Sequence, residues 1–333
     1  MAQESTAEPP RPKLKDSWSS LQDDYELRNV QKFRDAEQGS GLFGTSEDNR
    51  TTTLNDCPPP LHVPTRTRNL LFNIGLGIAV LDLCVMPIVY FYSLTFGAKL
   101  KRQTVFIVIT CLFCMMTFAH YTHRCFRLML KCSSRYGPIG WQRKWRLLEF
   151  TNVNFALCAS IFEIVLVIGT SPESPLLRIC TLPSAIICYY LGILFLLTST
   201  LTHYQVPIPF EMSSTPKGAP FRPALLAILE DSGAIEYRGE VPARLAVLRR
   251  YEASPLFRRM IQRLSWFWGV GFLVIAIITT ILIFSLEEEV AFGVGWGVPY
   301  VWATIYAIGT IIFVKASLRE ERRVWRSNLG ITT

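Results

Sequence analysis

Six apolar stretches, each long enough to cross a lipid bilayer, constrain what this sequence can fold into. A membrane-spanning helix needs roughly 20 mostly apolar residues, because the hydrocarbon core is about 30 Å thick and each helical residue rises about 1.5 Å. Only 18% of the residues are charged, and an ordinary soluble domain has about 25%. The sequence therefore predicts an all-α fold, a polytopic transmembrane helix bundle of about six spans. The predicted spans are Leu70–Phe96, Val105–Tyr121, Phe150–Gly169, Cys180–Leu201, Ser265–Leu286 and Phe292–Val314.

The start of the sixth stretch is interrupted by residues that weaken helices. Gly293, Gly295, Gly297 and Pro299 all fall in its first eight residues. A re-entrant segment over residues 292–299 is therefore an alternative to a full span. The spacing of Gly293 and Gly297 also suits a close contact with another helix.

Basic residues alternate between the two sides of the predicted spans. The N-terminal tail, the second and fourth connections and the C-terminal tail carry thirty of the 34 Lys and Arg residues, whereas the fifth connection carries none. Because cytoplasmic loops are enriched in Lys and Arg, we expect both termini to be cytoplasmic. The net charge of +8 reflects residues that flank spans, so we expect the lipid bilayer as partner and no nucleic acid.

The polar segments divide the chain into regions. The first 60 residues hold eleven acidic side chains and cannot bury enough apolar surface to fold alone. We predict a disordered cytoplasmic tail (1–60), four spans (61–201), a cytoplasmic connection with amphipathic helices (202–264), two spans (265–314) and a basic cytoplasmic tail (315–333).

The connection between the fourth and fifth spans is predicted to be partly helical. Ala224–Glu230 has a helical composition, and Pro242–Tyr251 sets Leu residues against Arg residues as an amphipathic helix does. Ser254 followed by Pro255 is typical of an N-cap and the first helical position. The helix that starts there should run directly into the fifth span.

A set of arginines in this connection lies next to the fifth span. Basic helices beside a span can bind anionic lipid headgroups, at about 1 kcal/mol for each cation. The alternative is a solvated basic face that binds no lipid and only reflects the enrichment of Lys and Arg in cytoplasmic loops. The candidate residues for anionic-lipid contact on the cytoplasmic side are Arg249, Arg250, Arg258, Arg259 and Arg263.

Two carboxylic acids interrupt apolar stretches, Asp82 in the first and Glu163 in the third. A charge at mid-membrane costs about 2.5–3.5 kcal/mol on the insertion scale, so both acids should face protein or water. Asn152 shares a helical stripe with Glu163, and the three residues form a possible intramembrane polar site. Such a site could bind a proton or a cation, or the acids could be neutral hydrogen-bonding groups. Arg178, near the outer end of the fourth span, could also pair with Glu163.

No other constellation predicts chemistry. Cys111, Cys114, His120 and His123 have a spacing that resembles zinc ligands, but on one helix the cysteines and histidines point to roughly opposite faces. Phosphate-binding loops, HExxH and G-x-S-x-G motifs are missing from the sequence. We expect no metal site, no cofactor and no catalytic residue.

Aromatic residues mark the predicted ends of several spans. Trp266 and Trp268 open the fifth span, and Trp296 lies near the start of the sixth. Such rings prefer the headgroup layer, because one end is apolar and the other polar. The sequence therefore predicts interfacial anchoring at these positions.

Three stretches resemble a group of uncharacterised multi-pass integral membrane proteins of filamentous fungi. They are SSTPKGAPFRPALLAILEDSGAIE (213–236), RYEASPLFRRMI (250–261) and FGVGWGVPYVWA (292–303). The resemblance runs from about Pro58 to Arg326. It implies a fungal membrane protein and carries no activity, substrate or site residue.

Three classes of function follow from these features. A non-enzymatic scaffold or accessory subunit fits the long tail, the organised connection and the few charges inside spans. A small proton- or cation-linked transporter or channel would use Asp82 and Glu163. A lipid-modifying membrane enzyme is the third class, and no motif points to it.

Overall fold

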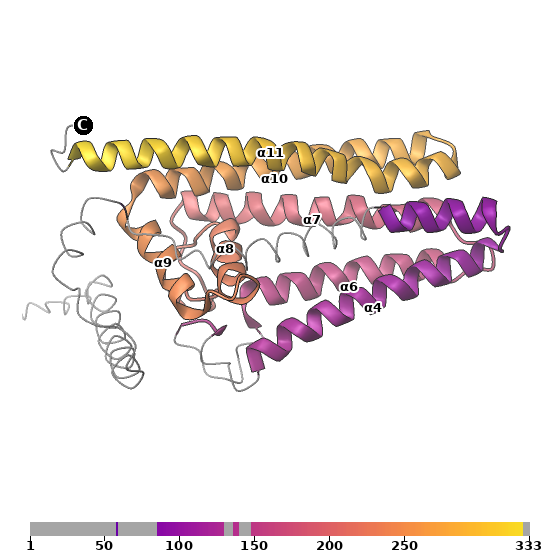
Figure 1. Cartoon of the computed structure of the whole chain (residues 1–333), viewed down its shortest axis with the longest axis horizontal. Coiled ribbons are helices and arrows are strands. Elements are labelled where there is room, and N and C mark those ends of the chain that lie inside the picture. Colours follow the sequence, from indigo (N-terminus) through magenta and orange to yellow (C-terminus); the bar gives the residue numbers. More distant parts are fainter. Residues whose placement is uncertain (1–57, 59–84, 130–135, 140–147, 329–333) are drawn as a thin grey trace, which may run out of the picture. The chain divides into compact units, whose positions relative to one another are not determined.

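The computed structural model describes residue 58 and residues 85–129, 136–139 and 148–328. In this part of the chain the fold is all-α, as predicted, with eight named helical elements (Figure 1). The predicted tail and most of the first predicted span, Asp82 included, lie outside the described residues. The elements are η1 (Ser93–Gly97), α4 (Arg102–Met129), α6 (Phe150–Thr170), α7 (Leu177–His203), α8 (Ala224–Ile235), α9 (Glu240–Ala253), α10 (Pro255–Ser285) and α11 (Glu288–Asn328).

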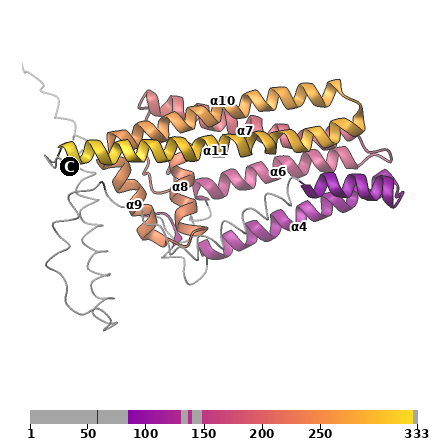
Figure 2. The ribbon, with the colours of Figure 1, turned by 45° about the horizontal axis from the view of Figure 1, so that its top comes forward.

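Five of the described helices are long and apolar enough to cross a membrane, and together they indicate an integral multi-pass protein. They are α4, α6, α7, α10 and α11, and they match the second to sixth predicted spans. The first predicted span is described from residue 85 onward, where a shorter apolar helix, Val85–Gly97, ends in the π-helical η1. Figures 1 and 2 show the five long helices running side by side.

The sixth predicted span is one continuous helix, so the re-entrant alternative is wrong. α11 runs from Glu288 to Asn328 through Pro299. Proline has no N–H, so the carbonyl of Gly295, four residues earlier, loses its helical donor. The hydroxyl of Ser184 in α7 donates to this carbonyl instead, at 2.7 Å. A second helix thus supplies the hydrogen bond that proline removes, and α11 continues.

Aromatic packing around Trp296 forms the main core of the membrane helices. Trp296 has no exposed surface. Its ring stacks on Phe113 of α4 at 5.4 Å between centroids and meets Phe162 of α6 edge-on at 5.8 Å. Phe292 of α11 packs on Phe91 of the Val85–Gly97 helix. The predicted interfacial anchoring by Trp296 is therefore wrong, because its ring joins three spans inside the protein.

Helices α8 and α9 follow an irregular segment that leaves α7, and they lie at one end of the long helices (Figure 1). α9 ends at Ala253, and the hydroxyl of Ser254 accepts a hydrogen bond from the backbone N–H of Phe257 at 3.2 Å. Ser254 is therefore the N-cap of α10, as predicted, and Pro255 is its first residue. We call α8 and α9 together the platform.

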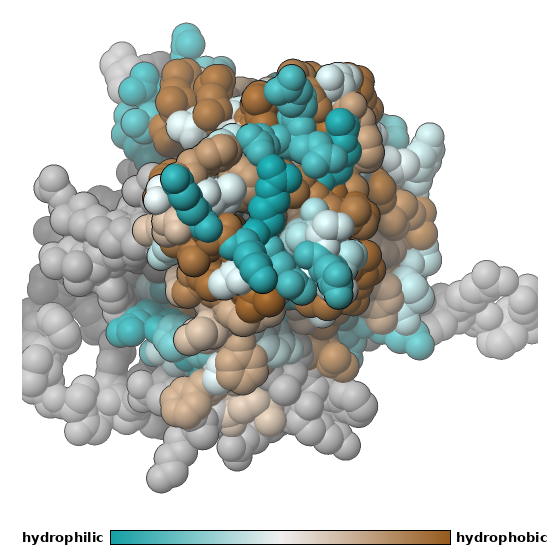
Figure 3. All heavy atoms as spheres, turned by 90° about the vertical axis from the view of Figure 1, so that its right-hand side faces the viewer, coloured by the Kyte–Doolittle hydropathy of each residue, from teal (hydrophilic) through white to brown (hydrophobic). Residues whose placement is uncertain are grey.

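The opposite end of the long helices carries short polar connections. Figure 3 views this end, where hydrophilic side chains gather among apolar ones. Arg102 pairs with Glu289 at 2.5 Å. Arg178 donates to the carbonyls of Ile283 and Phe284 at 3.0 and 2.7 Å. Arg178 thus caps the C-terminus of α10, and the predicted pair with Glu163 is wrong.

Candidate functional site

A buried network of charges joins the platform to α4 and α6. It consists of Arg124, Glu149, Glu230, Asp231, Glu236 and Arg244, and we call these six residues the ion network. Arg244 of α9, at its centre, has no exposed surface. One guanidinium nitrogen of Arg244 donates to Glu230 at 3.0 Å and to Asp231 at 2.5 Å. The other donates to Glu149, the residue before α6, and to the carbonyl of Tyr136 at 3.0 Å.

Arg124 forms the second centre of the ion network. This side chain lies near the end of α4, only 3% of its surface is exposed, and it donates to Glu149 at 2.7 Å. Its other terminal nitrogen pairs with Glu236, directly after α8. Glu149 therefore accepts hydrogen bonds from both Arg124 and Arg244, and its single carboxyl group links α4 to α9.

Hydroxyl and backbone groups add further hydrogen bonds to the ion network. Asp231 accepts hydrogen bonds from the hydroxyls of Thr151 and Ser213, each at 2.7 Å, and from the backbone N–H of Thr151 at 3.1 Å. Thr151 is the second residue of α6, where backbone N–H groups have no partner within the helix. Asp231 therefore caps α6 from another helix, and its negative charge suits the positive end of the helix dipole.

Burial and neighbouring charges set the protonation of the ion network. Burial raises the pKa of Glu149 to about 8, and the nearby charge of Asp231 adds to this effect against the opposing effects of Arg244 and Arg124. Burial also raises the pKa of Glu230. For Asp231 burial is outweighed by Arg244 and by hydrogen bonds, so its pKa is lowered. Burial thus opposes ionisation of Glu149 and Glu230, whereas Arg244 favours the charged form of Asp231.

The predicted intramembrane polar site is only partly described. The carboxylate of Glu163, half-buried on α6, accepts a hydrogen bond from the thiol of Cys114 on α4 at 2.8 Å. Its other oxygen is buried and has no hydrogen-bond partner among the described residues. Asn152 is fully buried in the first turn of α6, eleven residues or about 16 Å from Glu163 along the helix. Asn152 therefore lies near the ion network rather than near Glu163.

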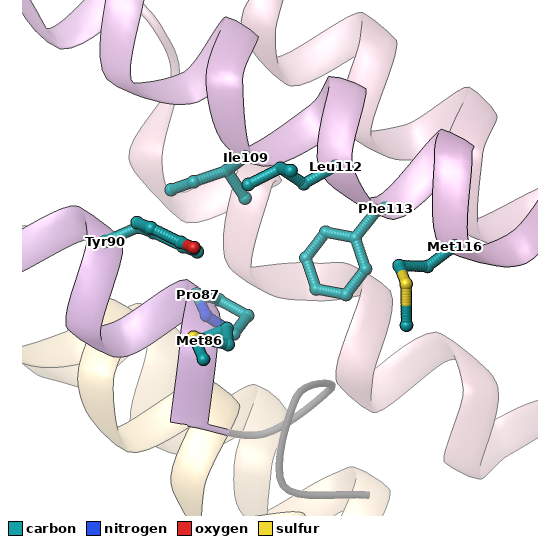
Figure 4. A pocket seen from close by; sticks show the side chains of 7 residues that line it. All are labelled: Met86, Pro87, Tyr90, Ile109, Leu112, Phe113 and Met116. Atoms are coloured by element: carbon teal, nitrogen blue, oxygen red, sulfur yellow. The ribbon is translucent and has the colours of Figure 1, made fainter. Parts of the chain in front are cut away.

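A small apolar cavity opens between the Val85–Gly97 helix and α4. Its volume is about 160 Å³, and Tyr90 brings the one hydroxyl group in its lining (Figure 4). The side chains around it offer an apolar surface and no charged group. The cavity could hold an apolar chain but has no group for chemistry. Its lining residues are Met86, Pro87, Tyr90, Ile109, Leu112, Phe113 and Met116.

Comparison with known proteins identifies a family but no activity. The model of a domain of unknown function, DUF8766, matches residues 47–325. The chain belongs to this family. The matched part of the DUF8766 chain includes the whole ion network, α4, α6, α7 and α10, and α11 as far as Trp325. No curated protein and no solved structure matches the chain.

The DUF8766 structure separates the arginines that the sequence grouped as lipid contacts. Arg249, Arg258, Arg259 and Arg263 are exposed. Arg250 is only 5% exposed and pairs with Glu321 of α11 at 2.5 Å. Arg250 therefore holds α9 against α11 and does not present its charge to lipid. Lipid contact by the other four stays a prediction.

Sequence analysis missed the ion network of the DUF8766 chain. The sequence predicts that Pro242–Tyr251 is an amphipathic helix with Arg residues on its polar face, whereas the structure buries Arg244 of this helix completely. One signal was present in the sequence. Glu230 and Asp231 end an otherwise apolar run, ALLAIL, and acids in such a context need buried partners. Their partners lie 13 to 80 residues away, so no local pattern identifies them.

Proposed function

We propose that this DUF8766 protein is a non-enzymatic membrane scaffold or accessory subunit whose platform is held rigidly on the spans. The ion network carries this proposal, because it fixes α9 to α4 and α6 through side chains that have almost no exposed surface. The Arg250–Glu321 pair adds a second connection, from α9 to α11.

The energetics of buried charges favour a fixed platform. A buried ion network adds little net stability, but it is satisfied only in one geometry, and removing one member costs about 3–5 kcal/mol. In this network Glu149 must lie between two guanidinium groups from different helices. A rigid surface presented by the platform suits recruitment of a partner. This arrangement gives the platform a structural use that requires neither catalysis nor movement.

The proposal places the platform and both termini in the cytoplasm. Charge counting supports this orientation, since thirty of the 34 basic residues fall on the side of the platform and tails. The three stretches that resemble fungal membrane proteins support a fungal origin.

The scaffold proposal can be tested with Arg244→Gln. We expect faster hydrogen exchange in α8 and α9, unchanged exchange in the middle of α10, and loss of the proteins that crosslink to the platform in cells. Arg258→Gln is the matched control, because Arg258 is exposed and has no ion-pair partner among the described residues. An unchanged set of crosslinked proteins in Arg244→Gln, despite faster exchange in the platform, would contradict the proposal.

A second candidate function, proton- or cation-linked transport, is favoured by one observation at Glu163. One oxygen of this carboxyl group is buried in an apolar helix with no partner among the described residues, and such a group in a span is a candidate ion site. In reconstituted vesicles, pH-dependent flux that is lost in Glu163→Gln at an unchanged melting temperature would establish transport. It would also contradict the scaffold proposal. A lipid-modifying enzyme gains no support from any residue that the structure describes.

A further inference from the structure

The edge of the hydrocarbon layer can be located on α10 and α11. The indole N–H of Trp268 donates to the hydroxyl of Thr310 at 3.0 Å, so these two residues lie at the same level of an antiparallel pair. The last large exposed apolar side chains toward the platform are Trp266 on α10 and Ile312 on α11. Both side chains lie two residues beyond the hydrogen-bonded pair. The edge of the hydrocarbon layer is therefore at the same depth on α10 and on α11.

The length of α10 agrees with this edge. From Trp266 to Ser285, its last residue, α10 has 20 residues, which rise about 30 Å. That length equals the usual thickness of the hydrocarbon core. Beyond Trp266 and Ile312 the two helices continue as a paired stem. It is held by buried side chains of α10, with Phe313, Val314 and Leu318 of α11 packed against them.

Exposed cations on the stem begin directly beyond the edge. Arg263 and Lys315 each lie three residues past it, at the same level on the two helices, or about 4.5 Å along the axis. The interfacial layer is about 5–8 Å thick on each side. The backbone of Arg263 and Lys315 therefore lies within the layer that holds the lipid phosphates.

Other stem cations lie farther from the edge. Arg259 and Arg319 are one turn beyond the first pair, and their long side chains can reach back toward the headgroups. Arg323 and Arg326 are about 16 and 21 Å from the edge, outside the interfacial layer. All six side chains are exposed, and none forms an ion pair with a residue that the structure describes. The six cations thus share exposure and the lack of an ion-pair partner among the described residues, and they differ in their depth in the membrane.

We propose that Arg263 and Lys315 form a binding site for the phosphate of anionic phospholipids, with Arg259 and Arg319 as its outer border. The positive charges of Arg263 and Lys315 are complementary to the negative charge of the lipid phosphate. On both helices the depth of these residues matches the layer that holds the phosphates. A solvated basic face would have no such dependence on depth. The site lies on the stem and not in the ion network, so it does not depend on the scaffold function.

Binding of a fluorescent short-chain phosphatidylserine to the purified full-length protein in detergent tests the site. We expect phosphatidylserine to bind more tightly than the matched phosphatidylcholine, and more weakly as salt is raised. Arg263→Gln with Lys315→Gln should weaken phosphatidylserine binding at least about fivefold, the effect of about 1 kcal/mol from one interfacial cation. Phosphatidylcholine binding should not change.

Two double variants control for charge and fold. Arg323→Gln with Arg326→Gln removes the same charge outside the interfacial layer and should change binding less than about twofold. Arg263→Lys with Lys315→Arg keeps the charge and should bind as the wild type does. If the distal variant weakens binding as much as the proximal one, or if the two lipids bind equally to the wild type, the proposal is overturned. If the proximal double variant does not fold, the single variants should each show a smaller loss in the same direction.

Discussion

Ser184 shows how one side chain can keep a helix continuous. Its hydroxyl donates to the carbonyl of Gly295, whose helical donor is absent because Pro299 lies four residues later. A side chain at position 295 would also collide with Thr181, since an added Cβ would lie 2.1 Å from its methyl group. Gly295, one of the residues that interrupt the sixth span in the sequence, is therefore the one that lets α7 come close enough to supply the hydrogen bond that α11 lacks.

Ser184→Ala should destabilise the protein by about 1–3 kcal/mol, because the buried Gly295 carbonyl would lose the donor that Ser184 supplies. The measurement is the thermal unfolding midpoint in detergent. Thr304→Val is the matched control, since the hydroxyl of Thr304 bonds only to its own helix, at the carbonyl of Tyr300, and is exposed. Equal melting temperatures for Ser184→Ala and the wild type would contradict this account of the Pro299 site.

The protonation of Glu149 predicts how stability depends on pH. Folding raises the pKa of Glu149 from the ordinary 4.5 to about 8, so the folded protein binds a proton that the unfolded chain releases. Stability from this group is complete below its ordinary pKa and is lost as the pH rises through about 8. The melting temperature should therefore fall between about pH 5 and pH 8, and Glu149→Gln should flatten this slope. The groups facing Glu149 are Arg124, Arg244 and Asp231.

The control for the pH prediction is Glu211→Gln, because Glu211 is exposed. Its pH profile should match that of the wild type. An equally steep fall in Glu149→Gln would assign the dependence to another group. Asp231, whose pKa is lowered on folding, contributes in the opposite direction and loses its contribution only in acid.

At the scale of helices, glycines on both α7 and α10 let these two helices pack closely. An added Cβ on Gly192 would lie 2.8 Å from Leu273, and one on Gly269 would lie 2.8 Å from Leu196. Sequence analysis instead pointed to Gly293 and Gly297. Of these, Gly293 closely faces Tyr92, whereas a Cβ on Gly297 would only touch Ile88 at an ordinary 3.8 Å. Spacing alone does not identify which glycines lie between helices.

Gly192→Leu or Gly269→Leu should force α7 and α10 apart and cost about 1–3 kcal/mol or more. Gly309→Leu is the control, because an added Cβ there has no atom within 4 Å and the new side chain can extend into lipid. Thermal unfolding in detergent should separate the first two variants from the third. Similar melting temperatures for all three would show that the helices are not in close contact at these glycines.

The elements differ in how well the sequence predicts them. Hydropathy locates α4, α6, α7, α10 and α11 because the bilayer imposes their length. The Ser254 cap is found because capping is local. The ion network is not found, because its bonds join segments up to 112 residues apart and its arginines have the spacing of a solvated face. Trp296 was misplaced for the same reason, since its burial depends on Phe113 and Phe162 from other helices.

At the scale of the whole molecule, the direction of the described helices bears on topology. Short polar turns connect α6 to α7 and α10 to α11 at one end of the long helices. The platform connects α7 to α10 at the other end, and α11 ends on the platform side (Figure 1). A span before α4, as the sequence predicts over Leu70–Phe96, would return the N-terminal tail to that same side. The orientation proposed above from the charge distribution makes this side cytoplasmic.

Glycosylation tests this topology directly. Asn49-Arg50-Thr51 is the only acceptor sequence in the chain, and glycosylation takes place outside the cytoplasm, so Asn49 should stay unmodified. An acceptor sequence inserted between α6 and α7, at residues 171–176, lies at the opposite end of the helices and should be modified. The measurement is a mass shift that a glycosidase removes. A shift in the natural sequence that Asn49→Gln abolishes would reverse the orientation of the tail. If the inserted sequence were also modified, the number of spans before α4 would be even, and Leu70–Phe96 could not be a single crossing.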